Sequence, residues 1–420
     1  MRENVNWDVE NERLNFLNQQ LYPTIYEWNG RLPNLRDIFR PVEIDWLLTE
    51  DVKNMDKFYD ILKEAPIIRF VIRTGYKDEP EVDKDGEPLL RRTTPVHWAA
   101  RYGKLDSPVI AELFQIFDRF DVNYVDEFGL THFHVACMSC HVVVVEKFLE
   151  LGQDPNCASN KTDPSLHLIV SFTDKYNVAE LLLKSGANPN LPGWKCGSTA
   201  LHIAIQSPID DSMAELLFKF CKDSMQIDAK DKLGRTPLQW AVARLLPSKV
   251  DLLLNNGAEL TSFVFPTEAH FYDRYESLEY IGSEVKLRVA SDALAVLERL
   301  ERGGYELDRS DALTIMKLFF KLGLFERNRD LYNDPFQLAE NLIDLSMIDG
   351  FDVIWNVLHR EKSVPRICEE ATRGFFRRWA LEFFLELTHY QLPILCCEKI
   401  VEKLENKDLF GVCMAASDLM

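Results

Sequence analysis

The densest group of metal-binding side chains in the sequence lies at residues 134–141, which read HVACMSCH. Two cysteines, Cys137 and Cys140, are flanked there by His134 and His141. Cysteine and histidine are the usual ligands of structural zinc, which takes four of them in a tetrahedron. The repeat register described below puts all four on a single helix, from which they cannot converge on one ion. The sequence therefore disfavours a metal site here.

Other chemical signatures are also missing from the sequence. The acidic run at residues 83–87 lacks the spaced carboxylates and the final glutamate of a calcium-binding EF-hand loop. Phosphate-binding loops, zinc-protease motifs and nucleophile elbows do not occur. We therefore expect a protein that is not an enzyme and that has no metal and no cofactor.

Charge and composition narrow the choice of partners. The net charge of −19 repels phosphate backbones and anionic lipids. No apolar run approaches the roughly 18 residues that span a bilayer. The nine cysteines are odd in number and mostly lie in apolar helical patterns, which is typical of reduced thiols in the cytosol. We expect protein partners, no nucleic acid and no membrane, with the protein located in the cytoplasm and also in the nucleus.

One heptapeptide recurs along the chain at intervals of 33 to 37 residues. Its five copies start near Thr94, Thr131, Pro164, Thr199 and Thr236, and read TPVHWAA, THFHVA, PSLHLIV, TALHIAI and TPLQWAV. A threonine before an apolar helical pattern acts as an N-cap, and proline fits the first helical position. Each copy therefore begins a helix.

A second apolar run follows about twenty residues after most copies. These runs end at Gly152, Gly186 and Gly257, where glycine is suited to the left-handed residue that closes a helix. The unit is thus a helix, a turn, a second helix, a glycine stop and a polar loop. Neither helix can bury its apolar face alone, so the units must stack into an all-α fold.

The five copies look like the Thr-Pro-Leu-His-x-Ala signature of ankyrin repeats, whose period is about 33 residues. This resemblance implies a solenoid of about five repeats over residues 94–260, followed by a C-terminal helical domain. It also implies that the motif histidines His97, His134, His167 and His202 are structural, with Gln239 in the last copy. Loops and first helices of ankyrin repeats generally bind other proteins. We therefore expect an unidentified protein target on this face, contacting Tyr124, Asp126, Phe128, Lys161, Trp194, Lys195, Lys230 and Lys232. The alternative is that the aromatic rings among them fold back onto neighbouring repeats.

The flanking regions carry no such signature. Residues 1–75 are predicted to form a helical cap, cut by Pro23, Pro33 and Pro41, with a degenerate repeat at residues 58–75. Residues 76–93 read as an acidic loop. The period stops after residue 258, and residues 261–360 are predicted to be a helical linker with helices at 285–302, 310–322, 336–347 and 353–358. A further helix is expected at 365–387.

The segment from Leu392 to Leu409 is the second informative stretch. It contains a Leu-Pro pair, apolar residues at helical spacing and an Asp-Leu pair, which is similar to the start of an F-box. Residues 361–420 resemble the PRANC domain that follows ankyrin repeats in poxvirus and parasitoid-wasp proteins. The resemblance implies docking on the linker subunit of an SCF-type cullin ubiquitin ligase through Leu392, Pro393, Ile394, Ile400, Val401, Leu404, Asp408 and Leu409. Leu395 departs from the pattern, because many F-boxes have glutamate there.

Two functions follow from these features. The first is an adaptor, in which the repeats hold a target and the tail recruits a ubiquitin ligase. The second is a scaffold or inhibitor that sequesters a partner, with a tail whose apolar residues simply pack on the preceding helix. Exposure of Pro393, Ile394 and Leu409 would favour the adaptor, and their burial would favour the scaffold.

Overall fold

The computed structural model describes residues 2–55, 65–207, 210–275, 283–324 and 364–417. Over these ranges the chain is helical, apart from three isolated β-bridges between loops. The chain forms two compact units. The N-terminal unit comprises residues 1–226 and 231–233, and the C-terminal unit comprises residues 227–230 and 234–420. The predicted all-α repeat architecture is confirmed.

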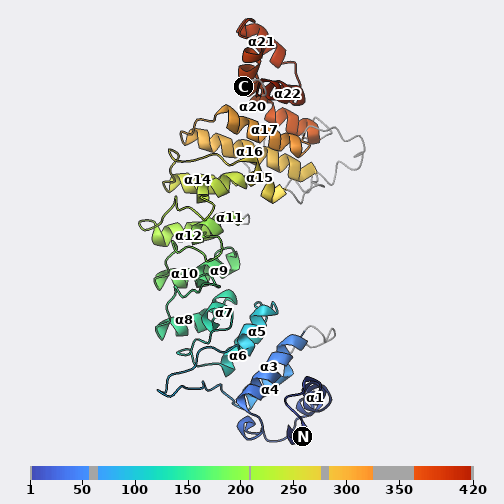
Figure 1. The fold of residues 1–420 in the computed structure, drawn as a ribbon, viewed down its shortest axis with the longest axis vertical. Coiled ribbons are helices and arrows are strands. Elements are labelled where there is room, and N and C mark those ends of the chain that lie inside the picture. The colour runs from blue at the N-terminus through green and yellow to red at the C-terminus, as the bar shows by residue number, and fades with distance from the viewer. Residues whose placement is uncertain (1, 56–64, 208–209, 276–282, 325–363, 418–420) are drawn as a thin grey trace. The chain divides into compact units, whose positions relative to one another are not determined.

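The N-terminal unit consists of helix pairs that stack on one another (Figure 1). The first helices of the pairs form one row, in which α3, α5, α7, α9 and α11 each contact the next. The second helices also contact one another. Helix α4 packs on α6, and α8 packs on α10 and also on α7, the first helix of its own pair. The helices of this unit are α1 (Glu10–Phe16), α2 (Tyr22–Tyr26), α3 (Pro41–Asn54), α4 (Pro66–Arg73), α5 (Pro95–Arg101), α6 (Val109–Ile116), α7 (His132–Met138), α8 (Val142–Glu150), α9 (Ser165–Ile169), α10 (Tyr176–Lys184), α11 (Ala200–Gln206) and α12 (Ser212–Cys221).

Short turns of other helix types complete the unit: η1 (Arg2–Asn4), η2 (Leu17–Leu21), η3 (Leu35–Asp37) and η4 (Thr173–Lys175). The turn η2 is a π-helix that joins α1 to α2 without a break. The predicted interruption at Pro23 is therefore wrong. Because Pro23 has no N–H, the wider π-turn just before it lets the helix continue.

The glycine stops predicted for the second helices are confirmed. Gly152, Gly186 and Gly257 have φ angles of 88°, 91° and 99°, the left-handed conformation that glycine adopts without strain. The loops after these stops are linked by side-chain amides. Asn156 donates to the Gly186 carbonyl oxygen at 3.1 Å, and Asn190 donates to the Ser224 carbonyl oxygen at 2.7 Å. Each helix pair is thus hydrogen-bonded to the next along the loop side as well as through its core.

The helical cap predicted at the N-terminus is organised around a buried carboxylate. Asp51, on α3, accepts hydrogen bonds from the backbone N–H groups of Ile67 and Ile68, both at 3.0 Å, and from the Tyr22 hydroxyl at 3.0 Å. It therefore ties α3, the start of α4 and α2 together. Burial raises the pKa of Asp51 to about 7. Helix α4 ends at Arg73, and Gly75, predicted to end the degenerate repeat, follows it with a left-handed φ angle of 76°. Residues 58–64 of that repeat lie outside the described residues.

The C-terminal unit contains longer helices. Here α14, α16 and α20 pack in succession, and α15 packs on α17 (Figure 1). The helices are α13 (Pro237–Ala243), α14 (Pro247–Asn255), α15 (Glu268–Tyr275), α16 (Ser283–Arg302), α17 (Arg309–Lys321), α20 (Val364–Leu387), α21 (Ile394–Val401) and α22 (Asn406–Ser417). Helices α16, α17 and α20 match the predictions, and Asp308 caps α17. The helices predicted at 336–347 and 353–358 lie outside the described residues.

Two arginines hold α21 against α20. Arg373 and Arg377 donate to the carbonyl oxygen of Glu402, which follows the end of α21, at 3.0 and 2.7 Å. Positive charge at a helix C-terminus is favourable because the carbonyl groups there carry partial negative charge. Asn406, fully buried at the start of α22, donates to the Thr372 hydroxyl at 2.9 Å. The tail helices are therefore fixed to α20 by specific polar contacts. None of the helices that the structure describes combines the length and apolarity needed to cross a bilayer.

Candidate protein-binding surfaces

The histidine of the second motif copy fixes the loop that follows it. In the second copy, the backbone N–H of Thr131 donates to His134 Nδ1 at 3.2 Å. His134 Nε2 lies 3.1 Å from the carbonyl oxygen of Cys157 and donates to it. The ring is therefore a neutral imidazole with its proton on Nε2. Burial lowers the pKa of His134 to about 4. The structural role predicted for His134 is visible in these bonds.

The same geometry recurs with a different residue. Thr236 N–H donates to Gln239 Oε1 at 2.8 Å, and Gln239 Nε2 donates to the Val264 carbonyl oxygen at 2.9 Å. The amide thus replaces both imidazole nitrogens. A further copy lies beyond the predicted end of the repeats, where Thr267 N–H donates to His270 Nδ1 at 3.2 Å. The period therefore continues one step past residue 258, into α15.

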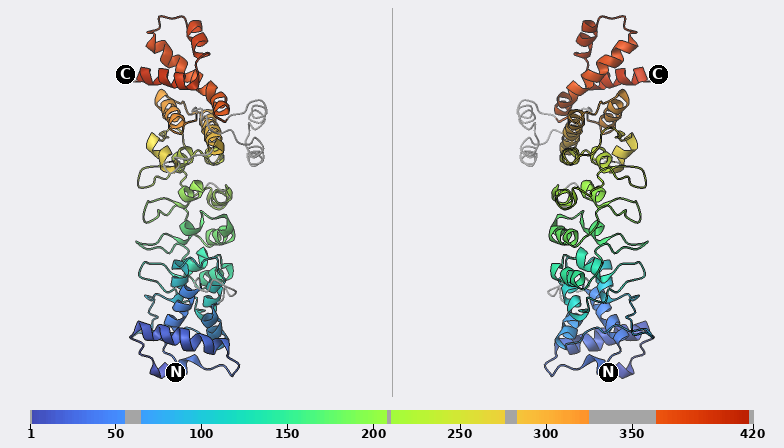
Figure 2. Two further views of the ribbon diagram at one scale, coloured as in Figure 1. Left: turned by 90° about the vertical axis from the view of Figure 1, so that its right-hand side faces the viewer. Right: turned by 90° about the vertical axis from the view of Figure 1, so that its left-hand side faces the viewer.

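The loops between helix pairs of the N-terminal unit project to one side of the helices (Figure 2), and we call them fingers. Finger 1 is residues 123–129, finger 2 is 156–163, finger 3 is 191–197 and finger 4 is 231–233. Neighbouring fingers touch closely. A Cβ atom on Gly129 would lie 2.2 Å from Ser159 Oγ, and one on Gly197 would lie 2.9 Å from Lys232 Cγ. Finger 1 is thus in van der Waals contact with finger 2, and finger 3 with finger 4.

Two of the predicted target-binding lysines also bridge fingers. Lys232 Nζ donates to the carbonyl oxygens of Trp194 and Lys195 at 2.7 and 3.0 Å. Lys161 Nζ donates to the Glu127 carbonyl oxygen at 3.3 Å. Both residues are exposed, as are Lys195 and Trp194, the latter at 45%. The structure therefore brings these four predicted residues together on the finger surface.

Three of the predicted target-binding residues lie elsewhere. Tyr124 is only 2% exposed, and its hydroxyl donates to Asp78 Oδ2 at 2.6 Å beneath the Arg92 guanidinium. Asp126 is buried and paired with Arg101 at 2.7 Å. Both predictions of a surface contact are wrong, because these polar groups satisfy buried partners. Lys230 is exposed but belongs to the C-terminal unit.

The structure adds residues that the sequence analysis missed. Phe128 is 53% exposed, as predicted, and the guanidinium of Arg101 lies 4.6 Å from its ring centre and 4.9 Å from that of Trp98. Tyr102 stacks on Trp98, with ring centres 5.8 Å apart. An arginine held between aromatic rings is stabilised by cation–π attraction. The signal in the sequence was Trp98 itself, which occupies a motif position that is aliphatic in the next three copies.

An exposed apolar surface covers one side of α21. We call it the tail strip, and it comprises Leu392, Pro393, Ile394, Leu395, Cys396 and Ile400, all of which are exposed. Ile394 and Leu395 are the most exposed of its large side chains, at 53% and 67%. Leu392, Pro393, Ile394 and Ile400 were predicted to dock. Contiguous exposed apolar groups on a folded domain are typical of interaction sites.

The other predicted docking residues behave differently. Val401 and Leu409 are buried, at 3% and 0% exposed, so they hold α21 and α22 in place and cannot touch a partner. Leu404 is half-buried. Asp408 is exposed, and its carboxylate accepts the Glu405 backbone N–H at 3.3 Å at the start of α22. Of the three residues whose exposure distinguishes the adaptor from the scaffold, Pro393 and Ile394 are therefore exposed and Leu409 is buried.

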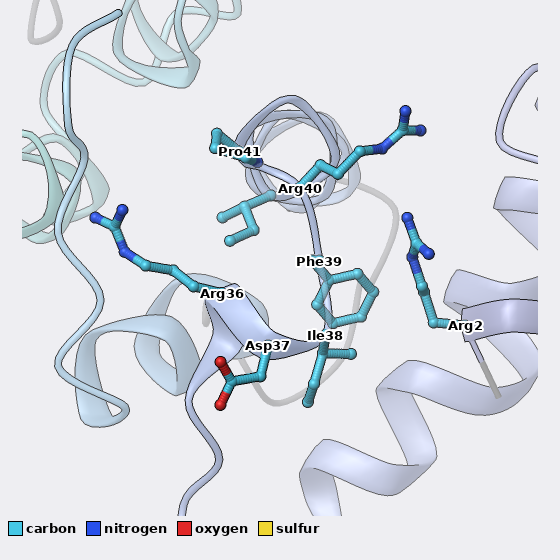
Figure 3. Close-up of a pocket in the computed structure, with 8 residues that line it drawn as sticks. Arg2, Arg36, Asp37, Ile38, Phe39, Arg40 and Pro41 are labelled. Carbon is cyan, nitrogen blue, oxygen red and sulfur yellow. The ribbon is translucent and has the colours of Figure 1, made fainter.

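Metal and small-molecule sites are poorly supported. The parts of the chain that the structure describes contain no group of three or more His, Cys, Asp or Glu side chains placed to hold a metal ion. A cavity of about 390 Å³ beside η3 (Figure 3) is lined by Arg2, Arg36, Asp37, Ile38, Phe39, Arg40, Pro41 and Ile44. Arg2 and Arg40 both contact Glu43 at 2.7 Å, and Arg36 contacts Glu79 at 2.7 Å. Carboxylates of the chain thus already neutralise its guanidinium groups.

Comparison with known proteins agrees with the repeat geometry. The family model for ankyrin repeats, in three copies, matches residues 166–263. The B-cell lymphoma 3 protein homolog of Mus musculus is 27% identical over 277 residues, which are 63% of this chain and 58% of that protein. The nuclear factor NF-kappa-B p105 subunit of Gallus gallus is 30% identical over 143 residues, 33% of this chain and 14% of that protein. The chain therefore spans less than two thirds of either relative.

Among solved structures, the ankyrin repeat domain of Bcl-3 is 24% identical, with a TM-score of 0.36, and the match covers 51% of this chain and 87% of that one. The assignment of ankyrin repeats rests on the family-model match and on the Thr–His cap geometry, and not on this structural likeness. In an architecture of stacked helix pairs with fingers, the helices form the scaffold and the surface side chains bind partner proteins. Residues 166–263 therefore carry ankyrin repeats, an architecture that is typical of protein binding.

Proposed function

We propose that this protein is an adaptor whose ankyrin repeats hold a target protein while its tail strip docks on the linker subunit of an SCF-type cullin ubiquitin ligase. Bringing the two together would raise the effective concentration of target lysines near the conjugating enzyme. We expect this activity in the cytoplasm and the nucleus. The ligase step rests on the F-box-like spacing from Leu392 to Leu409.

The observation that carries the proposal is the exposure of the tail strip. Leu392, Ile394, Leu395 and Ile400 are all at least 39% exposed, although Val401 and Leu409 beside them are buried. A chain that needed α21 only as a cap would gain by burying these side chains, because each buried aliphatic group stabilises a fold by roughly 1.5–3 kcal/mol. A partner that covers the strip would recover this free energy.

The test is binding of the purified full chain to the ligase linker subunit, measured by calorimetry. The variant Leu392→Ala/Pro393→Ala removes two exposed groups, so it should keep the helicity and melting temperature of the wild type. We expect micromolar or tighter binding by the wild type and at least a ten-fold loss in the variant, or about 1.4 kcal/mol. Val264→Ala is the matched control, because Val264 is a 66% exposed apolar residue of the same unit outside the strip.

The second candidate is a scaffold or inhibitor that sequesters a partner without ligase recruitment. The burial of Val401 and Leu409 favours it, because these two of the seven F-box-like apolar residues serve the fold. A well-folded wild type that does not bind the linker subunit at tens of micromolar would exclude the adaptor and favour the scaffold.

A further inference from the structure

The finger lysines carry uncompensated positive charge on an acidic protein. Lys161, Lys195 and Lys232 are exposed, and none forms an ion pair with a carboxylate within the described ranges. Two other exposed lysines of the same unit do pair. Lys77 lies 2.8 Å from Asp118, and Lys184 lies 3.0 Å from Glu180. With 67 acidic residues against 48 basic ones, three unpaired lysines on adjoining fingers need an explanation.

Neutral acceptors hold two of these ammonium groups in place. Lys232 Nζ contacts two carbonyl oxygens and Lys161 Nζ contacts one. Carbonyl oxygens orient an ammonium group without cancelling its charge. Since an ammonium has three N–H donors, at least one on each lysine is left for an external acceptor. The side chains are thus preorganised, which lowers the entropy lost when a partner binds.

Exposed aromatic rings lie beside the lysines. Lys161 Nζ is 6.0 Å from the ring centre of Phe128, which tips finger 1. Trp194, on finger 3, is exposed, and its backbone carbonyl oxygen accepts the hydrogen bond from Lys232 Nζ. Aromatic anchors combined with fixed charges are typical of the residues that dominate binding energy at interfaces. The surface therefore favours a ligand with both apolar groups and negative charge.

We propose that fingers 1 to 4 bind an acidic segment of the target protein, whose carboxylates contact Lys161, Lys195 and Lys232 while its apolar side chains contact Phe128 and Trp194. The proposal rests on the target-binding role of the repeats and adds the chemical class of the target. Nucleic acid is the less favoured polyanion, because three lysines cannot offset the repulsion from a net charge of −19.

The first experiment is selection of binders from a displayed library of random peptides on the immobilised full chain. We expect the selected peptides to be enriched in Asp and Glu together with aromatic or aliphatic residues. Recovery of no peptide at all would contradict target binding by the repeats. Recovery of neutral or basic peptides that need the fingers would leave target binding intact and overturn the acidic class.

The second experiment measures the affinity of one selected peptide by fluorescence anisotropy. The triple variant Lys161→Glu/Lys195→Glu/Lys232→Glu should bind roughly ten-fold more weakly or worse, since exposed charge pairs are individually modest but act together here. The triple arginine variant at the same positions keeps the charge and should bind within about three-fold of the wild type. Raising the salt concentration should weaken wild-type binding, because exposed charges are screened.

The matched control places the same charge change on the second helices. Lys147→Glu/Lys184→Glu/Lys222→Glu alters three exposed lysines of the N-terminal unit outside the fingers and should leave the affinity unchanged. An equal loss in this control would mean a nonspecific effect of net charge and would overturn the proposal. If an oligonucleotide binds the wild type more tightly than the peptide does, and the triple finger variant loses that binding, the acidic-peptide proposal is overturned in favour of nucleic acid.

Discussion

Histidine and glutamine perform the same task at the cap of the repeat helices. His134 accepts a backbone N–H through Nδ1 and donates through Nε2, whereas Gln239 accepts through Oε1 and donates through Nε2. Only the histidine can become protonated. A proton on Nδ1 would face the Thr131 N–H, so the buried cation would lose an acceptor and gain a repulsion. The choice between the two residues therefore changes the response of stability to pH.

We predict that His134→Gln makes the free energy of unfolding less sensitive to acid. The pKa of His134 is about 4 in the folded state, because of burial, against about 6.5 in the unfolded chain. Below pH 6.5 the unfolded state takes up a proton that the folded state refuses until pH 4, so the wild type loses stability across this window. The wild type should lose up to about 3 kcal/mol more than the variant between pH 7 and pH 4.

Urea unfolding followed by circular dichroism at several pH values would measure this difference. At pH 7 the two proteins should agree within about 1 kcal/mol, because glutamine can form both hydrogen bonds. Burial raises the pKa values of Asp45 and Asp51 to about 6 and 7, but these groups titrate in both proteins and cancel in the comparison. Parallel pH profiles for wild type and variant would contradict the prediction.

At the residue scale, the cap was predictable from sequence and the partners of finger residues were not. The Thr-to-His spacing is local, so the motif indicated the role of His134 directly. The burial of Tyr124 depends on Asp78 and Arg92, which lie 46 and 32 positions earlier and carry no local signal of proximity. Phe128 and Trp194 are exposed, which is one of the two arrangements that the sequence left open. The residues that contact them, such as Arg101 and Lys232, could be identified only from the three-dimensional structure.

At the scale of elements, close contact between fingers puts different demands on two left-handed glycines. Gly197 has a φ angle of 69° and lies against Lys232, where an added Cβ would come within 3.2 Å of the Lys232 backbone nitrogen. Gly152 has a φ angle of 88° and has nothing within 4 Å of its Cβ position. Alanine at either site has the same conformational strain, but only at Gly197 does it also separate two fingers.

We predict that Gly197→Ala destabilises the protein by more than Gly152→Ala does. Left-handed strain alone should cost about 1 kcal/mol in each variant. The clash with backbone on finger 4 should add about 1–2 kcal/mol for Gly197→Ala, as overpacking does elsewhere. Urea unfolding of both variants would measure the difference. Equal destabilisation would show that finger 4 does not rest on finger 3 in solution.

Helices were predicted well where their end signals are local. The glycine stops follow from a few adjacent residues. The repeat at Thr267 was missed because only Thr267 and His270 of the signature remain, with Glu268 and Ala269 in place of its proline and leucine. The burial of Leu409 was missed because apolar spacing marks one face of a helix without stating what covers it. The boundaries of the predicted domains stay predictions.

At the scale of the whole molecule, the two proposed binding surfaces belong to different compact units. The fingers lie in the N-terminal unit and the tail strip in the C-terminal unit. Substitutions that share no contacts usually have additive effects. An adaptor requires this independence, because it must hold its target and the ligase at the same time. A scaffold with a structural tail has no such requirement.

We therefore predict that damage to one surface leaves binding at the other unchanged. The triple finger variant should bind the linker subunit within about two-fold of the wild type, and Leu392→Ala/Pro393→Ala should bind the selected acidic peptide equally well. Only the wild type should form a ternary complex, which size-exclusion chromatography with light scattering would detect. If either ligand displaces the other, the two surfaces compete, and the chain cannot work by bringing target and ligase together. If the tail variant loses the peptide without losing helicity, the tail strip supports the repeats and the scaffold function is favoured.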